Sequence, residues 1–230
     1  MAKTKVALAL GSGGARGLTQ IGVIEELEKN DFEIVAISGT SIGSLIGGLY
    51  ANNHLVGFKN WISNLDKSGV FNLVDFTLNK QGFVKGDRVF NAMRKFVPEV
   101  EIEDLRIPFA AVTADLKSRE EVILTKGNLF EAIRSSVAVP SVLTPVKRGK
   151  QLFVDGGVVN PLPITAIPKS DAELVIAVNL CGQTSTQTLP TIKNKSKKDN
   201  GWVEKIQNQF NKSFKEYFLS SENVLISLLL

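Results

Sequence analysis

Short apolar runs and amphipathic stretches alternate along most of the chain. Runs typical of strands buried in a sheet cover residues 5–10, 33–38, 108–114, 120–125, 151–154 and 173–180. Apolar residues three or four positions apart predict helices near 15–30, 41–53, 55–66, 86–97 and 127–138. This alternation favours an α/β protein with a central, mainly parallel sheet between helices, a three-layer α/β/α arrangement.

The pattern changes near residue 183. Residues 183–200 are rich in Gln, Thr, Ser, Asn and Lys, which predicts a polar linker or loop between a folded domain at 1–182 and a C-terminal segment at 201–230. An apolar stripe recurs every four residues in that segment, at Trp202, Ile206, Phe210, Phe214 and Phe218. A helix with this stripe either docks on the domain or on a second copy of the chain, or lies in a membrane interface. Both alternatives, and with them a homo-oligomer, stay open.

Composition and charge narrow the class of protein. The 230 residues, 43% of them hydrophobic, are compatible with one domain that has a substantial core, and the net charge is +4. From Gln183 onward seven lysines stand against four acidic residues, so the basicity belongs mainly to the C-terminal part. These lysines lack the interleaved aromatic residues of a nucleic-acid module, which argues against a nucleic-acid partner. Without an apolar run of about 18 residues or a secretory signal, and with Cys181 as the single cysteine, the sequence favours a cytoplasmic protein, peripheral to a membrane if the C-terminal stripe binds one.

A serine between two glycines lies where an apolar strand gives way to a helix of small residues, in Gly39-Thr40-Ser41-Ile42-Gly43. The two glycines permit the tight turn that lifts a serine hydroxyl out of a sheet, as in the nucleophile elbow of serine hydrolases. The helix N-terminus that follows favours developing negative charge. Ser41 is therefore the predicted nucleophile.

The base that activates Ser41 cannot be the chain's single histidine. A helix that starts at Ser41 places His54 at its far end, roughly 20 Å away. The best carboxylate is Asp155, which ends a short apolar strand and is followed by Gly156 and Gly157. Because an ionised aspartate is a weak base, we expect a partly desolvated site that raises the pKa of Asp155.

A glycine-rich turn follows the first predicted strand, with Gly11, Gly13, Gly14, Arg16 and Gly17 in the sequence Gly-Ser-Gly-Gly-Ala-Arg-Gly. Such a turn at a helix start exposes several backbone N–H groups and forms a cradle for an anion. The dinucleotide fingerprint and the phosphate loop both require glycine where Arg16 stands. A cradle for an oxyanion is therefore favoured over a nucleotide site.

Along the chain the glycine-rich turn at 11–17 comes first, the Gly-Thr-Ser-Ile-Gly turn at 39–43 second and Asp-Gly-Gly at 155–157 third. The three motifs in this order resemble the patatin-like phospholipases, and in particular their bacterial members. The resemblance spans about residues 5–180 and includes the stretches 113–116, 135–140 and 160–163. It implies a lipid acyl hydrolase with a Ser41–Asp155 dyad, with Gly13 and Gly14 as the principal oxyanion donors and Arg16 beside them. It implies no cofactor and no obligatory calcium, and the chain has no Cys/His cluster typical of a zinc site.

The leading hypothesis is a serine esterase that cleaves acyl esters of lipids, of the phospholipase A, lysophospholipase or esterase type. The alternative is a non-enzymatic regulator or adaptor of the same fold that binds a protein or a membrane, and acyl transfer to an acceptor other than water is a third option. The apolar, glycine-interrupted residues 68–86 suit either an acyl-chain pocket or lid, or a loop packed on the core.

Overall fold

The computed structural model describes residues 2–65, 87–140 and 142–182. The predicted linker at 183–200, the segment at 201–230 and the apolar stretch at 68–86 lie outside these residues. The strands are β1 (Thr4–Leu10), β2 (Phe32–Thr40), β3 (Phe109–Asp115), β4 (Glu120–Leu124), β5 (Val146–Arg148), β6 (Gln151–Asp155) and β7 (Leu174–Val178). The α-helices are α1 (Thr19–Lys29), α2 (Ile42–Ala51), α3 (Leu55–Ser63), α5 (Asp87–Met93) and α6 (Leu129–Ser136). Short 3-10 helices are η1 (Gly14–Leu18), η2 (Ile102–Asp104), η3 (Gly156–Val158) and η4 (Ile164–Ala166).

The strands form one sheet in the order β5-β6-β3-β2-β1-β7, and β4 pairs with β3 off this path. The four neighbours β3, β2, β1 and β7 are parallel, as the alternation of strands and helices predicts. The other three strands make the sheet mixed, because β4 and β6 run antiparallel to β3 and β5 runs antiparallel to β6. Strand β5 was not among the predicted strands.

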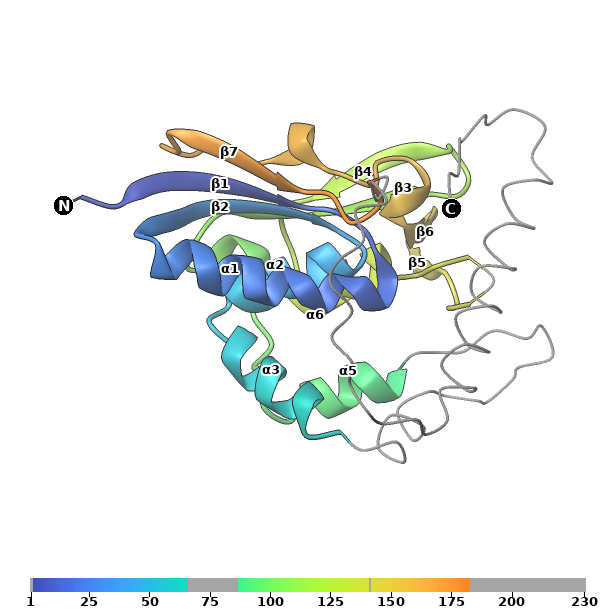
Figure 1. The fold of residues 1–230 in the computed structure, drawn as a ribbon. Helices are drawn as coiled ribbons and strands as arrows, with labels where there is room; N and C mark the ends of the chain where they lie inside the picture. Colours follow the sequence, from blue (N-terminus) through green and yellow to red (C-terminus); the bar gives the residue numbers. More distant parts are fainter. Residues whose placement is uncertain (1, 66–86, 141, 183–230) are drawn as a thin grey trace. The chain divides into compact units, whose positions relative to one another are not determined.

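The two faces of the sheet carry side chains of different size. Large residues such as Leu10, Ile37 and Phe109 face α2, where a Cβ on Gly47 would lie 2.6 Å from Ile37 Cγ2. Helices α1, α2 and α6 cover this face (Figure 1). On the opposite face, the hydroxyls of Ser38 and Thr40 donate to backbone carbonyls of residues 163 and 160 at 2.6 and 2.9 Å. Both faces are therefore covered, one by helices and the other by a segment that includes η3 and η4, which agrees with the expected three layers.

Strand β3 brings the ends of two other strands together. Its first half pairs with β2, where Thr40 is the partner of Val112, and its second half pairs with β6, where Asp155 is the partner of Thr113. Strand β4 pairs with Ala111–Asp115 on the other edge, so β2 and β6 share a single edge of β3. Because β2 and β6 run in opposite directions along this edge, their carboxyl ends meet. This register, rather than a parallel sheet alone, places residues 41 and 155 side by side.

Candidate active site

Ser41 and Asp155 are in direct contact. The Ser41 Oγ donates a hydrogen bond to Asp155 Oδ2 at 2.5 Å, across 114 positions of sequence. Both residues are buried, with 8% of Ser41 and 5% of Asp155 exposed. The hydroxyl and the carboxylate singled out from the sequence therefore lie together at the point where β2 and β6 meet.

The backbone at Ser41 has the left-handed conformation of a sharp turn. Its φ is 57° and its ψ is −125°, a backbone conformation that residues other than glycine rarely adopt. Gly39 and Gly43 are required by close packing, because a Cβ on Gly39 would lie 2.4 Å from Gly43 O and a Cβ on Gly43 would lie 2.1 Å from Leu10 O. The turn from β2 into α2 thus has the features of a nucleophile elbow.

A second serine holds this turn. The backbone N–H of Ser41 donates to Ser136 Oγ at 2.9 Å, and the Ser136 hydroxyl donates to Val112 O at 2.6 Å. Ser136 is fully buried at the end of α6, whereas the hydroxyl of its neighbour Ser135 donates within the same helix to Glu131 O. Sequence reasoning missed Ser136, because two adjacent serines on a helix give no signal of which one faces a turn 95 positions away.

The environment of Asp155 changes its acidity. Burial raises the pKa of Asp155 to about 6, although hydrogen bonds from the Ser41 hydroxyl and the Gly157 N–H act in the opposite direction. The Gly157 N–H donates to Asp155 Oδ1 at 2.7 Å and fixes the carboxylate. Gly156 is required here, because a Cβ on it would lie 2.3 Å from Val112 O. A carboxylate with this pKa accepts a proton more readily than an exposed aspartate and is still largely ionised at neutral pH.

The glycine-rich turn is anchored to the sheet by its first residues. The N–H of Gly11 donates to Val178 O at 3.1 Å, and the N–H of Ser12 donates to Pro161 O at 2.8 Å. The side chain of the buried Gln20 donates to Gly11 O at 2.7 Å. These bonds come from β7, from the segment after β6 and from α1, so the turn is held from three sides.

The same turn packs against the other two motifs. A Cβ on Gly17 would lie 2.2 Å from side-chain atoms of Ile42, the residue after the candidate nucleophile. A Cβ on Gly157 would lie 3.3 Å from Ser12 Oγ. The three motifs, separate in the sequence, therefore converge at one end of the sheet.

Successive N–H groups of this turn are available to a ligand. Among the described residues, the N–H groups of Gly13, Gly14 and Ala15 donate no hydrogen bond. Gly14 has a φ of +55°, and a Cβ there would meet no atom within 4 Å, so the turn is open on that side. The side chain of Arg16 is exposed, and its N–H donates to Gly13 O at 3.2 Å. Because of this arrangement the turn can bind an anion through its backbone.

The single histidine lies away from these groups. His54 follows the C-terminal end of α2, and its Nδ1 is hydrogen-bonded to Asn52 O. Helix α2 has ten residues, about 15 Å, between the turn at Ser41 and this end. The structure therefore separates His54 from Ser41, as the spacing predicts. The described ranges contain no group of three or more His, Cys, Asp or Glu residues that could hold a metal ion.

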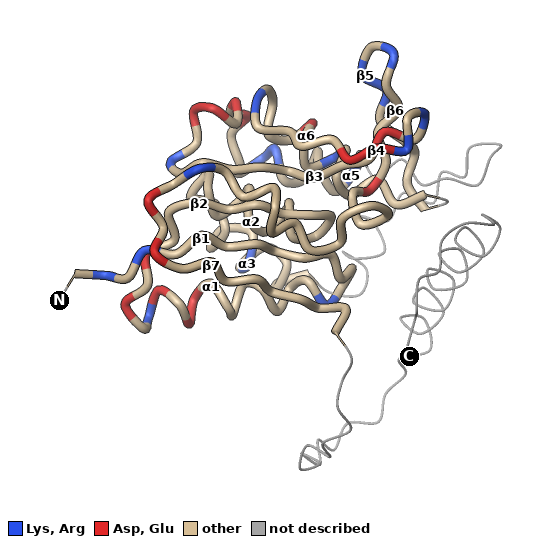
Figure 2. The backbone as a smooth tube through the Cα atoms, turned by 90° about the horizontal axis from the view of Figure 1, so that it is seen from above, with Lys and Arg blue, Asp and Glu red and all other residues tan. Residues whose placement is uncertain are grey.

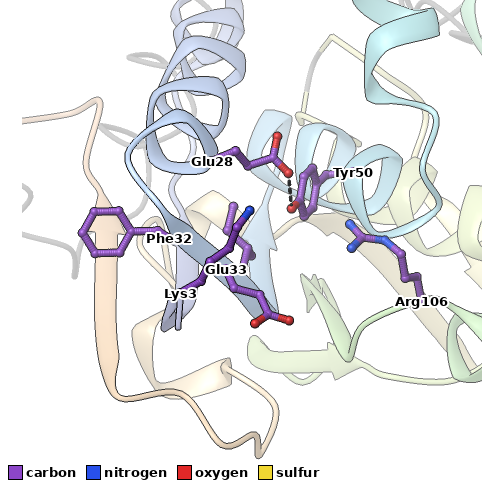
Figure 3. A pocket seen from close by; sticks show the side chains of 7 residues that line it. Lys3, Glu28, Phe32, Glu33, Tyr50 and Arg106 are labelled. Atoms are coloured by element: carbon purple, nitrogen blue, oxygen red, sulfur yellow. Dashed lines mark hydrogen bonds between the residues drawn. The ribbon is translucent and has the colours of Figure 1, made fainter. Parts of the chain in front are cut away.

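A hollow of about 350 Å³ lies at the end of α2 that is far from Ser41 (Figure 3). It is lined by Lys3, Glu28, Phe32, Glu33, Ile34, Tyr50 and Arg106. In it the Tyr50 hydroxyl donates to Glu28 Oε1 at 2.7 Å, and the Arg106 guanidinium carbon lies 4.9 Å from the centre of the Tyr50 ring. This hollow contains none of the three motifs, so we do not assign it to the candidate active site.

No helix in the part of the chain that the structure describes is long and apolar enough to cross a membrane.

Comparison with known proteins gives a consistent family. Residues 8–167 match the family model described as patatin-like phospholipase. An uncharacterized NTE family protein of Mycobacterium tuberculosis is 40% identical over 178 residues, which are 77% of this chain and 49% of that protein. Lysophospholipase NTE1 of Debaryomyces hansenii is 30% identical over 78% of this chain and 12% of its own length. Patatin-like phospholipase domain-containing protein 6 of Mus musculus is 31% identical over 79% of this chain and 14% of its own length.

One solved structure that the comparison matched is VipD from Legionella pneumophila, with a TM-score of 0.48 and 15% identity over 76% of this chain and 49% of that one. The chain spans about half the length of the mycobacterial relative and a smaller share of the other two. The match to the family model covers well over half of the chain. The chain therefore belongs to the patatin-like phospholipase family.

Proposed function

We propose that this chain is a serine esterase that cleaves acyl esters of lipids, of the phospholipase A or lysophospholipase type, with Ser41 as nucleophile and Asp155 as general base. The observation that carries the proposal is the 2.5 Å hydrogen bond between Ser41 Oγ and the buried carboxylate of Asp155. The names of relatives, a lysophospholipase and a phospholipase domain protein, support the choice of a lipid ester as substrate.

In the first half of the reaction, Ser41 Oγ attacks the carbonyl carbon of the ester while its proton moves to Asp155 Oδ2. The carbonyl oxygen becomes an oxyanion. When the tetrahedral intermediate collapses, the bond to the leaving alcohol breaks and Asp155 returns the proton to the alcohol oxygen. A base in this position contributes about 10²–10⁴ to the rate.

In the second half, a water molecule takes the place of the alcohol. Asp155 accepts a proton from the water as the water oxygen attacks the acyl-Ser41 carbonyl. The fatty acid then leaves, and the proton returns to Ser41 Oγ. The bond from the Gly157 N–H to Asp155 Oδ1 keeps Oδ2 directed at the reacting oxygen through both halves.

Oxyanion stabilisation has a larger role in this proposal than in a triad with histidine, because aspartate is the weaker base. We assign it to the N–H groups of Gly13 and Gly14, with Arg16 beside them. The absence of other acceptors for these N–H groups among the described residues supports the assignment. Each donor of this kind contributes on the order of 10²–10³ to the rate.

Covalent labelling tests the proposal directly. Wild-type protein is treated with a fluorophosphonate, digested and mapped by mass spectrometry, and hydrolysis of lysophosphatidylcholine and p-nitrophenyl esters is followed in parallel. We expect the label on Ser41, and we expect Ser41→Ala to abolish both labelling and turnover. Ser170→Ala, at an exposed serine, is the control and should behave as wild type.

A folded wild-type protein that neither reacts with the probe nor cleaves any ester in the panel would contradict the proposal. It would favour the alternative of a non-enzymatic regulator or adaptor. Product analysis with added alcohols separates hydrolysis from acyl transfer, since a transferase forms the new ester.

A further inference from the structure

Two turns beyond the candidate active site form a single basic projection, which we call the basic tip (residues 116–119 and 147–150). The first segment is the turn that joins β3 to β4, and the second comprises the last two residues of β5 and the turn that joins β5 to β6. They are held together by hydrogen bonds from the Leu116 N–H to Leu152 O at 2.8 Å and from Lys117 Nζ to Lys150 O at 2.6 Å. Figure 2 shows Lys and Arg gathered at these turns.

The basic tip contains five cationic residues and no carboxylate. These are Lys117, Arg119, Lys147, Arg148 and Lys150, and all five are exposed. No ion pair between described residues involves any of them. Two carboxylates, Glu120 and Glu121, follow on β4, and the latter accepts a hydrogen bond from Asn160. Five cations therefore stand against three adjoining carboxylates, Asp115, Glu120 and Glu121, and none of the five is held in an ion pair between described residues.

Some described cations outside the tip form ion pairs. Lys5 pairs with Asp171, Lys29 with Glu26 and Lys59 with Glu25. These pairs involve β1, α1 and α3, outside the basic tip. Exposed cations such as Lys3, Lys95 and Lys169 also form no ion pair with a described residue, so the tip is distinguished by having five such cations in two adjoining segments.

Asp115 keeps the two turns in a fixed shape. Its Oδ1 accepts from the Lys117 N–H at 3.1 Å and from the Leu152 N–H at 3.2 Å. The Arg119 N–H donates to Asp115 O at 2.7 Å, and Arg119 has a φ of 63°. Because the carboxylate of Asp115 is buried and its bonds join both turns, the cations are presented by a preformed surface.

The basic tip lies at the same end of the sheet as Ser41. Asp155 is the partner of Thr113 in β3, which ends two positions later at Asp115, directly before the turn at 116–119. Exposed apolar side chains accompany the cations, with Leu116 38% and Ile123 42% exposed. Cations interspersed with apolar residues are typical of surfaces that bind the headgroup region of a membrane.

We propose that the basic tip docks this protein on bilayers that contain anionic phospholipids and so brings the Ser41 end of the sheet to lipid. The proposal rests on the proposed function only for the choice of a lipid surface as the partner. Each cation near an anionic bilayer strengthens binding about fivefold, and added salt weakens it.

The test measures sedimentation of the full chain with vesicles of phosphatidylcholine alone or mixed with phosphatidylserine. The variant Lys147→Gln/Arg148→Gln/Lys150→Gln removes three tip cations. The control Lys3→Gln/Lys29→Gln/Lys95→Gln removes the same charge from other exposed positions. We expect the tip variant to bind the mixed vesicles more than about tenfold more weakly than wild type, and the control to bind within about twofold. Unchanged melting temperatures confirm that both variants fold.

Equal losses in the two variants, or no loss in the tip variant, would overturn the proposal. A tip variant that retains vesicle binding but loses affinity for heparin would also overturn the proposal, because that result would show that the tip binds a soluble polyanion and not a membrane. Ser41→Ala separates this proposal from the esterase: it should bind vesicles as wild type does. Binding that depends on the tip in a protein without esterase activity would leave the docking surface standing and reject the proposed function.

Discussion

A hydroxyl group donates a hydrogen bond to a carboxylate at each end of helix α2. At the N-terminal end the pair is Ser41 and Asp155, 2.5 Å apart, and at the C-terminal end it is Tyr50 and Glu28, 2.7 Å apart. The second pair lines the hollow of about 350 Å³ (Figure 3). The first pair is the one we assign to catalysis.

The environments of the two pairs explain this choice. Asp155 is buried and burial raises its pKa to about 6, whereas Glu28 is exposed to solvent. Burial also raises the pKa of the Tyr50 phenol, so this hydroxyl stays protonated near neutral pH. Of the two hydroxyl-bearing residues, Ser41 is the one with a left-handed φ. The glycine-rich turn, whose N–H groups at Gly13 and Gly14 donate no hydrogen bond among the described residues, packs against the residue that follows Ser41. A desolvated base, a sharp turn and free donors, rather than cavity volume, distinguish the candidate active site.

Matched amide substitutions give the largest expected difference between the two ends. Asp155→Asn removes the base, and we expect turnover of lysophosphatidylcholine to fall by at least about 10³-fold, because base and oxyanion stabilisation act together. Glu28→Gln keeps an acceptor for the Tyr50 hydroxyl and should stay within about twofold of wild type. Steady-state kinetics on both proteins measure the contrast.

Equal activity in the two variants would remove the reason for placing catalysis at the N-terminal end of α2. A large loss of turnover in Glu28→Gln alone would indicate that catalysis takes place at the hollow near Tyr50. Circular dichroism on each variant ensures that a loss of turnover does not arise from unfolding.

The sequence predicts many, but not all, of the features that distinguish the candidate active site. The strands at 5–10 and 33–38 and the helix that follows Ser41 are present within a few residues of their predicted bounds, because buried runs and small-residue patterns are local signals. The antiparallel direction of β6 is not a local signal, since an apolar run is equally apolar in both directions. The pairing of Ser41 with Asp155 was predicted by excluding His54, without knowledge of the shared edge of β3 that produces it.

Two other features depend on tertiary structure. Ser136 gains its partner only when α6 packs beside β3. The basic tip gathers cations from two segments about 30 positions apart, whereas counting along the sequence assigned the positive charge mainly to residues after 183. Neither could be read from spacing, because no periodic pattern joins the segments involved.

The pH dependence of turnover gives the next largest effect. Asp155 acts as a base only when ionised, and its pKa is raised to about 6. We therefore expect kcat/KM to fall about tenfold for each pH unit below that value and to level off above it. Initial rates on a soluble p-nitrophenyl ester over a pH series measure this fall, the acid limb of the pH profile. A limb centred near the ordinary value of 3.8 would show that Asp155 is not desolvated in solution.

The raised pKa also has a consequence for stability. Because the folded state binds the Asp155 proton more tightly than the unfolded state does, this group favours folding at pH below 3.8 and costs stability as pH rises through about 6. Asp155→Asn removes that cost and should stabilise the fold by up to about 3 kcal/mol at pH 8. The gain should shrink as pH falls toward 4. Urea unfolding of both proteins at two pH values checks the sign, and an equal effect at both would contradict it.

Adjacent serines on α6 test how the elbow is held. Ser136→Ala leaves the Ser41 N–H and Val112 O without this shared partner, and an unsatisfied buried group costs about 1–3 kcal/mol. We expect fluorophosphonate labelling of Ser41 to slow about tenfold. Ser135→Ala removes only a bond within the helix and should label within about twofold of wild type. Equal rates in the two variants, measured on folded protein, would make Ser136 dispensable for the turn.

The smallest expected effect is at the other end of α2. Tyr50→Phe removes the hydroxyl that donates to Glu28 and keeps the ring that Arg106 covers. Because the exposed Glu28 carboxylate regains water, the loss should be near the low end for a hydrogen bond, about 0.5–1 kcal/mol in urea unfolding. Turnover should not change. If Tyr50→Phe instead lowered turnover as Asp155→Asn does, the two hydroxyl–carboxylate pairs would be functionally linked through α2, and burial alone would no longer explain why one of them is the candidate catalytic pair.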